Sequence, residues 1–316
     1  MSNDVHISVR TLVEYVYQSG SIDSRFRSQS SLLDGTRIHQ KVQKTYQDTD
    51  QKEVYLSTKM SYHDLHFLIE GRCDGLLFHN GEVIVDEIKS ISQPLEGING
   101  EEYPVHWAQA KMYAFMYCKD RELSEITVQL TYVHVELGDK KYYKKSITFL
   151  ELESFAYKMV EGYAPYAGFK QKHHSIRNES IKALNFPFEK YRTGQRKMAG
   201  AVYKTILDEK SLFTNAPTGI GKTISTLFPT VKAIGEGLLN RFFYLTAKTI
   251  TRTTAEEAFA MMRSGGLCLN TLTITAKDKV CFKDETICQR IIVSMQMAIM
   301  IESMRPFLIF LSLKMQ

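Results

Sequence analysis

The stretches Leu65–Phe78 (LHFLIEGRCDGLLF) and Glu82–Ser90 (EVIVDEIKS) are two strand-like runs on either side of Asn80-Gly81. Asn-Gly between apolar runs is typical of a two-residue type I′ turn, because both turn residues need positive φ. The sequence therefore predicts a β-hairpin. A two-residue turn also fixes the register, and we expect the pairs His79–Glu82, Phe78–Val83, Leu77–Ile84, Leu76–Val85, Gly75–Asp86 and Asp74–Glu87.

This register places the carboxylates of Asp74 and Glu87 opposite each other. Directly opposed side chains point to the same side, with Cβ atoms about 5 Å apart, so the two charges repel unless a cation lies between them. Lys89 follows on the same face. Carboxylates that hold a divalent cation beside a lysine are suited to metal-assisted phosphodiester hydrolysis. The alternative is an exposed strand edge with Glu87 and Lys89, and Asp74 in a turn with Gly75.

Two predicted helices supply further candidate residues. The stretch Val105–Tyr117 has helical spacing, and its Gln109 and Tyr113 share one face because they lie four residues apart. The stretch Ser31–Tyr46 is a second predicted helix. It carries His39, which offers a nitrogen ligand for a metal, although a lone helical histidine is more often structural.

These elements together resemble RecB-type nucleases of the PD-(D/E)xK superfamily. The matching motifs are Gly35–His39, Gly71–Asp74, Glu87-Ile88-Lys89 and Gln109–Tyr113. The resemblance implies that Mg²⁺ or Mn²⁺ is bound by His39, Asp74, Glu87 and the Ile88 carbonyl. It also implies that Lys89 is catalytic, with Asp74 and Glu87, and that Gln109 and Tyr113 position DNA. Some relatives hold an iron–sulfur cluster in this domain, but Cys73 and Cys118 are too few for one here.

The remaining elements of this half follow from spacing and composition. We expect a helix over Ile7–Gln18 capped by Ser8, a strand over Glu125–Val135 and a helix over Leu150–Gln171. The polar stretch Gln171–Lys182 is expected to form the boundary between domains. The run Lys140–Lys145 (KKYYKK) suits either a nucleic-acid backbone or a solvated hairpin.

The second half is organised around Phe213–Thr223 (FTNAPTGIGKT), which predicts a short strand, a glycine loop and a helix start. Its last eight residues fit the phosphate-loop pattern, with Ala216 in place of the first glycine. Such a loop cradles phosphate with backbone N–H groups at a helix N-terminus, while the lysine and the hydroxyl reach the terminal phosphates and Mg²⁺. We expect ATP to be bound by Ala216, Pro217, Thr218, Gly219, Ile220, Gly221, Lys222 and Thr223.

Further motifs surround this loop. Gln195 starts a predicted helix that ends at Leu207, and its amide suits the N6 and N7 atoms of adenine. Predicted strands at Arg241–Leu245 and Leu269–Thr275 alternate with predicted helices, which favours a parallel, RecA-like sheet.

Together, Tyr191–Gln195, Ala216–Thr223, Tyr244–Thr249 and Ile274–Cys281 resemble the start of a DinG/XPD-type superfamily-two helicase. The resemblance implies that Gln195 reads adenine, that Lys248 touches single-stranded DNA, and that Cys281 and Cys288 match the first two of four iron–sulfur ligands. No third or fourth cysteine follows, so we expect no assembled cluster. No apolar strand ending in Asp-Glu follows the loop either, and we expect ATP binding without unwinding.

Composition and the last residues complete the picture. The chain has 316 residues, a net charge of +5 and five irregularly spaced cysteines, which favours a cytoplasmic protein without a disulfide framework. No signal segment or membrane span is evident. Residues 290–316 form a methionine-rich, atypical tail, and our hypothesis is that a frameshift truncated a longer gene. The alternative is an ordinary apolar C-terminal strand.

The sequence thus predicts an α/β protein with three parts: a nuclease-like mixed sheet flanked by helices at 1–180, a partial RecA-like parallel sheet at 181–289, and the tail at 290–316. We expect a DNA repair or processing protein with a metal-dependent nuclease domain and single-stranded DNA as its partner. One alternative is a non-catalytic module that binds ATP and DNA. The other is a phosphate-loop kinase or transferase unrelated to DNA.

Overall fold

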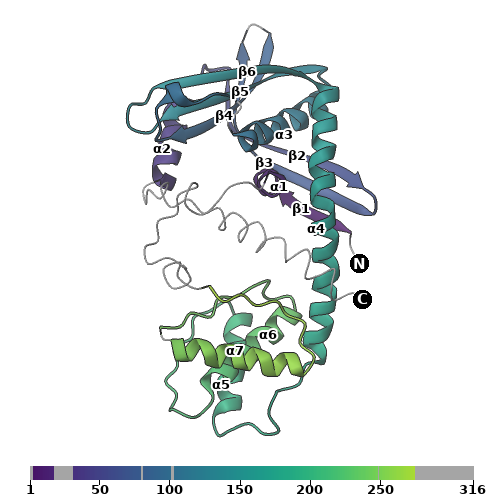
Figure 1. Ribbon diagram of the computed structural model, residues 1–316, viewed down its shortest axis with the longest axis vertical. Helices are drawn as coiled ribbons and strands as arrows, with labels where there is room; N and C mark the ends of the chain where they lie inside the picture. The colour runs from purple at the N-terminus through teal and green to yellow at the C-terminus, as the bar shows by residue number, and fades with distance from the viewer. Residues whose placement is uncertain (1–2, 18–30, 80, 101–102, 248, 275–316) are drawn as a thin grey trace, which may run out of the picture. The chain divides into compact units, whose positions relative to one another are not determined.

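The computed structural model describes residues 3–17, 31–79, 81–100, 103–247 and 249–274. Internal contacts divide the chain into two compact units, one up to Ala167 and one over Gly168–Thr275 (Figure 1). We call them the sheet unit and the helical unit and describe each separately. Within the described residues, none of the helices is both long and apolar enough to cross a membrane.

The sheet unit contains a mixed sheet of six strands. They are β1 (Asp4–Ser8), β2 (Gln51–Tyr62), β3 (Leu65–His79), β4 (Glu82–Ile91), β5 (Glu125–His134) and β6 (Lys140–Thr148). The order along the sheet is β1-β3-β4-β5-β6, and β2 pairs antiparallel with β3. The β1–β3 and β4–β5 pairs are parallel and the others are antiparallel. The mixed α/β fold predicted for the chain is confirmed.

The predicted hairpin register is confirmed for the five pairs from His79–Glu82 to Gly75–Asp86. Gly81 takes φ 83°, the left-handed conformation that the tight turn requires. The sixth predicted pair, Asp74–Glu87, is not part of the ladder. The reason is that the Asp74 carboxylate itself accepts a hydrogen bond from the Ile88 amide at 2.7 Å, in the place of a backbone carbonyl of β3.

The sheet is therefore open at one point between β3 and β4. One edge of β3 pairs with β2, and the other edge is shared by β1 and β4. On the shared edge, β3 pairs with β1 through residues 66–70 and with β4 through residues 75–79. Residues 71–74 of β3 and 87–91 of β4 lie between these ladders, and neither set pairs with the other. This opening, which we call the notch, leaves the polar groups of these residues outside the β3–β4 ladder.

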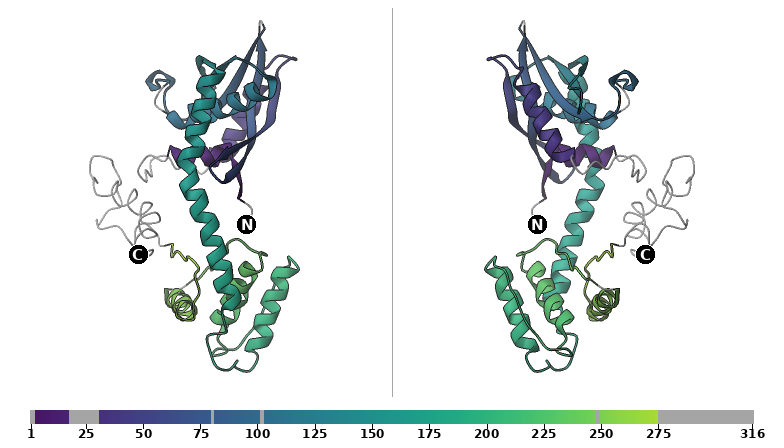
Figure 2. Two further views of the ribbon diagram at one scale, coloured as in Figure 1. Left: turned by 90° about the vertical axis from the view of Figure 1, so that its right-hand side faces the viewer. Right: turned by 90° about the vertical axis from the view of Figure 1, so that its left-hand side faces the viewer.

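Two helices cover opposite faces of the sheet beside the notch. Helix α2 (Ser31–Gln43) packs its Ile38 and Val42 against Ile88, and helix α3 (Pro104–Arg121) packs in the core cluster that contains Val85. Successive strand residues point to opposite faces, so Ile88 and Val85 lie on different sides of β4. In the right-hand view of Figure 2, α2 lies in front of the strands.

The chain begins differently from the prediction. Residues Asp4–Ser8 form β1, and the helix α1 begins only at Val9 and ends at Val16. Ser8 is the N-cap, as predicted, and its hydroxyl accepts from the Thr11 amide at 3.1 Å. The strand was missed because it is held by parallel pairing with β3, some sixty residues away in sequence, which no local pattern reveals.

The polar stretch at 171–182 does not interrupt the helix before it. Helix α4 runs from Phe149 to Ala183, so the prediction of a helix that ends at Gln171 is wrong. Polar residues interrupt a helix only when they break its hydrogen bonding, and His173 to Lys182 contains neither glycine nor proline.

The helical unit has a core formed by α6 (Lys222–Gly235), α7 (Thr249–Ser264) and the end of α4. Helix α5 spans Gln195–Leu207, as predicted, and packs against α6. Leu227 and Val231 of α6 and Met262 of α7 are almost completely buried in this core.

The predicted parallel sheet is not formed in the described part of the helical unit. The segments predicted as strands, near 213, 241–245 and 269–274, have no strand partner there. Several of their large side chains face solvent: Phe213 is 96% exposed, Leu245 89% and Leu272 83%. The tail at 290–316 lies outside the described residues.

Candidate functional site

Asp74 lies at the centre of the notch and connects three elements. Its Oδ2 accepts from the Ile88 amide of β4, and its Oδ1 lies 3.2 Å from Nδ1 of His39 on α2. The imidazole is partly buried. Burial lowers the pKa of His39, but the hydrogen bond and the charge of Asp74 outweigh it and leave the pKa raised. The structure thus brings together His39 and Asp74, which sequence reasoning had placed in one site.

Glu87 is the most deeply buried acid of the notch, with 1% of its surface exposed. Its Oε1 lies 2.7 Å from Nζ of Lys89. Burial raises the pKa of Glu87 to about 7; Lys89 opposes this shift, and the charge of Asp74 adds to it. Oε2 of Glu87 is buried and has no hydrogen-bond partner among the described residues. A buried carboxylate oxygen without a partner is costly, so it marks a place that a cation or a donor suits.

Lys89 also connects β4 to α3. Its Nζ donates to Oε1 of Gln109 at 3.1 Å. Gln109 is hydrogen-bonded in turn to Tyr113, one turn later on the same helix. Burial, followed by the charge of Glu87, raises the pKa of Tyr113. Gln109 and Tyr113, which were predicted to share one face of a helix, therefore reach the same notch as Glu87 and Lys89.

Gly71 explains how α3 comes so close to β3. A Cβ atom at this position would lie 2.8 Å from the hydroxyl of Tyr113. Glycine is thus required for the contact between the strand and the phenol ring, and the pattern Gly-Arg-Cys-Asp at 71–74 has a physical basis in this approach.

A second buried acid, Asp86, was not singled out from the sequence. It is 1% exposed and accepts from Tyr46 at 2.7 Å, Gln129 at 2.9 Å and Thr131 at 2.5 Å. Burial raises its pKa, and these hydrogen bonds oppose the shift. Since Tyr46 lies three residues beyond the end of α2, the bond ties that end of the helix to β4 and so helps to place His39. Asp86 is satisfied within the protein and offers no free oxygen to a ligand.

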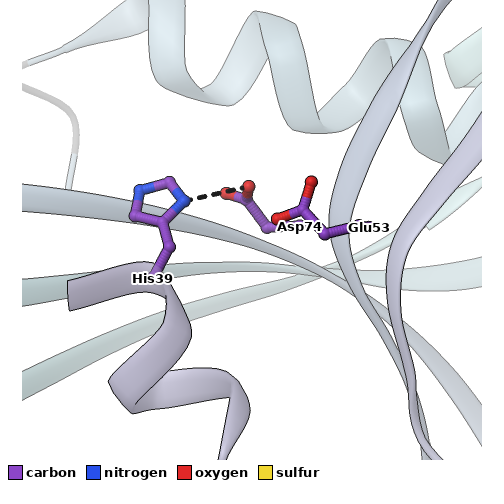
Figure 3. Close-up of side chains that lie close together, drawn as sticks. All are labelled: His39, Glu53 and Asp74. Carbon is purple, nitrogen blue, oxygen red and sulfur yellow. Dashed lines mark hydrogen bonds and ion pairs between the residues drawn. The ribbon is translucent and has the colours of Figure 1, made fainter. Parts of the chain in front are cut away.

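Glu53 was also missed. One ligand atom each from His39, Glu53 and Asp74 lie within 4.8 Å of one another, a group able to hold a metal ion (Figure 3). Glu53 belongs to β2, in a stretch (DQKEVYL) that resembles an ordinary alternating strand. Its position opposite the notch depends on the pairing of β2 with β3, so no sequence signal identified it.

The basic run at 140–145 begins strand β6, and two of its lysines hold structural positions. Lys141 donates to the carbonyls of Leu95 and Ile98 at 3.0 and 2.9 Å. The ammonium group of Lys145 lies 4.5 Å from the ring centre of Trp107. Much of this run therefore anchors the neighbouring loop and α3.

The predicted phosphate loop has the expected backbone features. Gly219 and Gly221 take φ 85° and 81°, conformations open to glycine, and α6 begins directly afterwards at Lys222. The ammonium group of Lys222 donates to the carbonyls of Ala216 and Pro217 at 2.9 and 3.0 Å. The lysine therefore closes the loop on itself.

Gln195 is buried beside this loop, with 2% of its surface exposed. Its Oε1 accepts from the Arg192 amide at 2.9 Å, and its Nε2 lies 2.5 Å from the place of a Cβ at Gly221. Arg192 donates to the Gly219 carbonyl at 2.5 Å. These contacts join 192–195 to the loop. Lys248, Cys281 and Cys288 lie outside the described residues.

Comparisons with known proteins add little to this geometry. No protein-family model matches the chain, and no curated protein matches it. One solved structure, titled "Crystal structure of SSO0001", is similar to part of this chain. The alignment covers 51% of this chain and 76% of the chain in that structure, at 17% identity and a TM-score of 0.34. A likeness of that size bears on neither the site nor the activity.

Proposed function

We propose that the sheet unit is a metal-dependent DNA nuclease whose active site is the notch. The observation that carries the proposal is Glu87, a buried carboxylate with an unpartnered oxygen, in electrostatic contact with Asp74, His39 and Lys89. Two acids and an imidazole are a donor set that fits Mg²⁺ or Mn²⁺, and the nitrogen favours Mn²⁺. His39, Asp74 and Glu87 would hold the ion, with the Ile88 carbonyl as the ligand that the family resemblance adds.

A bound divalent cation would polarise the phosphodiester and lower the pKa of a water molecule. In the net reaction, the hydroxyl of water bonds to phosphorus, the bond to the leaving oxygen breaks, and that oxygen takes up the proton. Lys89 places its ammonium group beside Glu87 and stabilises the charge that builds on phosphorus. Gln109 holds Lys89 in this position, and with Tyr113 it orients the DNA backbone.

The helical unit is proposed to bind ATP. The positive φ angles of Gly219 and Gly221, and the helix that begins at Lys222, favour this function. Lys222 would exchange the two carbonyls of its own loop for the terminal phosphates, and Gln195 would contact adenine. The competing proposal, a module that binds ATP and DNA without cleavage, is separated from the nuclease by the following experiment.

The test is cleavage of end-labelled single-stranded DNA with Mn²⁺, Mg²⁺ or EDTA. The wild-type chain should cut with metal and not with EDTA, and Lys89→Ala should reduce the rate about 100-fold or more, the usual cost of losing one group that stabilises transition-state charge. Lys158→Ala, which removes an exposed lysine of α4, is the matched control and should keep the wild-type rate. Absence of cleavage by the wild type with either metal would favour the binding module.

A further inference from the structure

The basic run at 140–145 divides between the two faces of the sheet. Strand β6 is the last strand in the sheet order and pairs with β5 alone among the described strands. Successive side chains of a strand point to opposite faces. Lys141, Tyr143 and Lys145 lie on the face of α3, where the two lysines contact a loop and the ring of Trp107. The anchoring contacts of the run therefore use only every second residue.

The other residues of the run, Lys140, Tyr142 and Lys144, lie on the face that α2 covers. The pairing of β5 with β6 places Tyr142 opposite Thr131, whose hydroxyl donates to the buried carboxylate of Asp86. Partial burial raises the pKa of Tyr142, and the charge of Asp86 adds to the shift. The tyrosine is nevertheless 51% exposed, so about half of this aromatic side chain faces solvent.

Lysines surround this tyrosine. Lys140 and Lys144 flank it on β6, and the ammonium group of Lys140 donates to the hydroxyl of Thr45 at 3.1 Å. Lys41 of α2 reaches the turn before β6, where its Nζ lies 3.2 Å from the place of a Cβ at Gly138. Within the part of the chain that the structure describes, none of the three lysines forms an ion pair with a carboxylate. Their charge is therefore available to a polyanion.

We propose that Tyr142 and these three lysines form a binding track for single-stranded DNA, in which a base stacks on the tyrosine and the ammonium groups contact phosphates. An exposed aromatic ring among lysines suits a single strand of any sequence, because every base has a face that stacks and every nucleotide carries a charge. A duplex keeps its bases stacked inside and can use only the lysines. This inference rests on the proposed nuclease and names a surface outside the notch that holds its substrate.

The track lies close to the proposed cleavage site. Asp86, whose charge acts on Tyr142, directly precedes Glu87 on β4, and only β5 separates β4 from β6. Two strand spacings amount to about 10 Å. Helix α2, which carries His39, covers the same face of the sheet as the track. A DNA strand with one phosphate in the notch can therefore place a nearby base on the tyrosine.

The test of stacking is the fluorescence anisotropy of a labelled deoxythymidine oligonucleotide, titrated with the full chain in EDTA to prevent metal-dependent cleavage. The wild type should bind this strand more tightly than a duplex of the same length. Tyr142→Ala should weaken binding at least about 5-fold, the effect of one lost stacking contact, and Tyr142→Phe, which keeps the ring, should match the wild type. Tyr157→Ala, which removes a similarly exposed tyrosine of α4, is the control.

The lysines are tested through salt. Replacing Lys140 and Lys144 together by glutamine should reduce the slope of log affinity against log salt concentration by about 1.4. The reason is that each phosphate contact to a single strand contributes about 0.7 to that slope. Replacing Lys59 and Lys158 by glutamine, which removes two exposed lysines of β2 and α4, is the matched control and should leave the slope unchanged.

Unchanged affinity of Tyr142→Ala, or an unchanged slope of the Lys140 and Lys144 variant, would overturn the proposal. The lysines would then serve to protect the edge of the sheet from pairing with other chains. Tighter binding of the duplex by the wild type would overturn it as well. Cleavage with Mn²⁺ is measured separately. Binding as expected without cleavage would sink the nuclease and leave the track standing, whereas cleavage with affinity that these substitutions leave unchanged would do the reverse.

Discussion

The hairpin of the sheet unit and the strand-like segments of the helical unit began as similar predictions and ended differently. In the hairpin, Leu76 and Val85 are paired as predicted and completely buried. In the helical unit, Phe213, Leu245 and Leu272 come from segments that were also predicted to be strands, yet they are largely exposed and have no strand partner among the described residues.

The difference lies in what sets the partner of each strand. A two-residue turn brings its own two strands together, so the Asn80-Gly81 turn specifies both the partner and the register of the antiparallel pair. A parallel sheet requires strands distant in sequence, with helices that cover both faces. An apolar run therefore predicts a strand reliably only where its partner is specified nearby.

The largest expected difference between the two regions comes from replacing one leucine in each of them with alanine. Leu76→Ala in the hairpin should lower the free energy of unfolding by about 2–5 kcal/mol, because it leaves a cavity in the core. Leu245→Ala should change it by less than about 0.5 kcal/mol, because the side chain is 89% exposed.

Urea unfolding followed separately in each unit measures both changes. Leu227→Ala, which truncates a leucine of α6 that is 1% exposed, is the control in the helical unit and should cost as much as Leu76→Ala. A large loss of stability from Leu245→Ala would mean that the segment is packed in solution, and the contrast between the regions would be lost.

The pH dependence of stability tests the raised pKa of Glu87, the buried acid of the notch. Glu87 has an ordinary pKa near 4.5 when unfolded and about 7 when folded. Between these values the folded chain keeps a proton that the unfolded chain releases, so stability should fall as pH rises from about 4.5 to about 7 and then level off. The loss should be on the order of 3 kcal/mol. Thermal melting in EDTA from pH 4 to 8 measures it.

The Glu87→Gln variant cannot ionise at this position and should lack that part of the pH dependence. Glu82→Gln, at the exposed start of the same strand, should keep the wild-type profile. Parallel profiles for the wild type and Glu87→Gln would show that the buried carboxylate does not retain a proton in the folded state, and would contradict the raised pKa of Glu87.

The smallest expected effects concern two glycines of the helical unit. Gly221→Ala forces a side chain into φ 81° and against Gln195, and should cost about 1–2 kcal/mol and weaken ATP binding. Gly200→Ala, inside α5 with open space around it, should instead stabilise the chain by up to about 1 kcal/mol. Melting and fluorescent-nucleotide titration measure the two responses. Equal ATP affinity of the wild type and Gly221→Ala would show that the loop does not contribute to ATP binding.

Sequence reasoning reached part of the candidate site and missed part of it. The hairpin register indicated Asp74, Glu87 and Lys89, and the family resemblance added His39, Gln109 and Tyr113. Hydrogen bonds connect these side chains at the notch. Asp86 and Glu53 were missed because their roles depend on partners that are distant in sequence. Asp86 accepts hydrogen bonds from Gln129 and Thr131. Glu53 is placed by the pairing of β2 with β3. Asp74 itself differs from the prediction, because its carboxylate bonds to the Ile88 amide where a strand pair was expected.

The sequence by itself determined five pairs of the hairpin register, the Ser8 cap and the bounds of α5, because each depends on residues within a few positions of one another. The tertiary structure alone decided where β3 leaves β4, that Glu53 lies beside His39 and Asp74, and that the apolar segments of the helical unit have no strand partner among the described residues. Those outcomes depend on which distant strand supplies the next hydrogen bonds, and a backbone amide can be satisfied by a strand or, as at Ile88, by a single carboxylate.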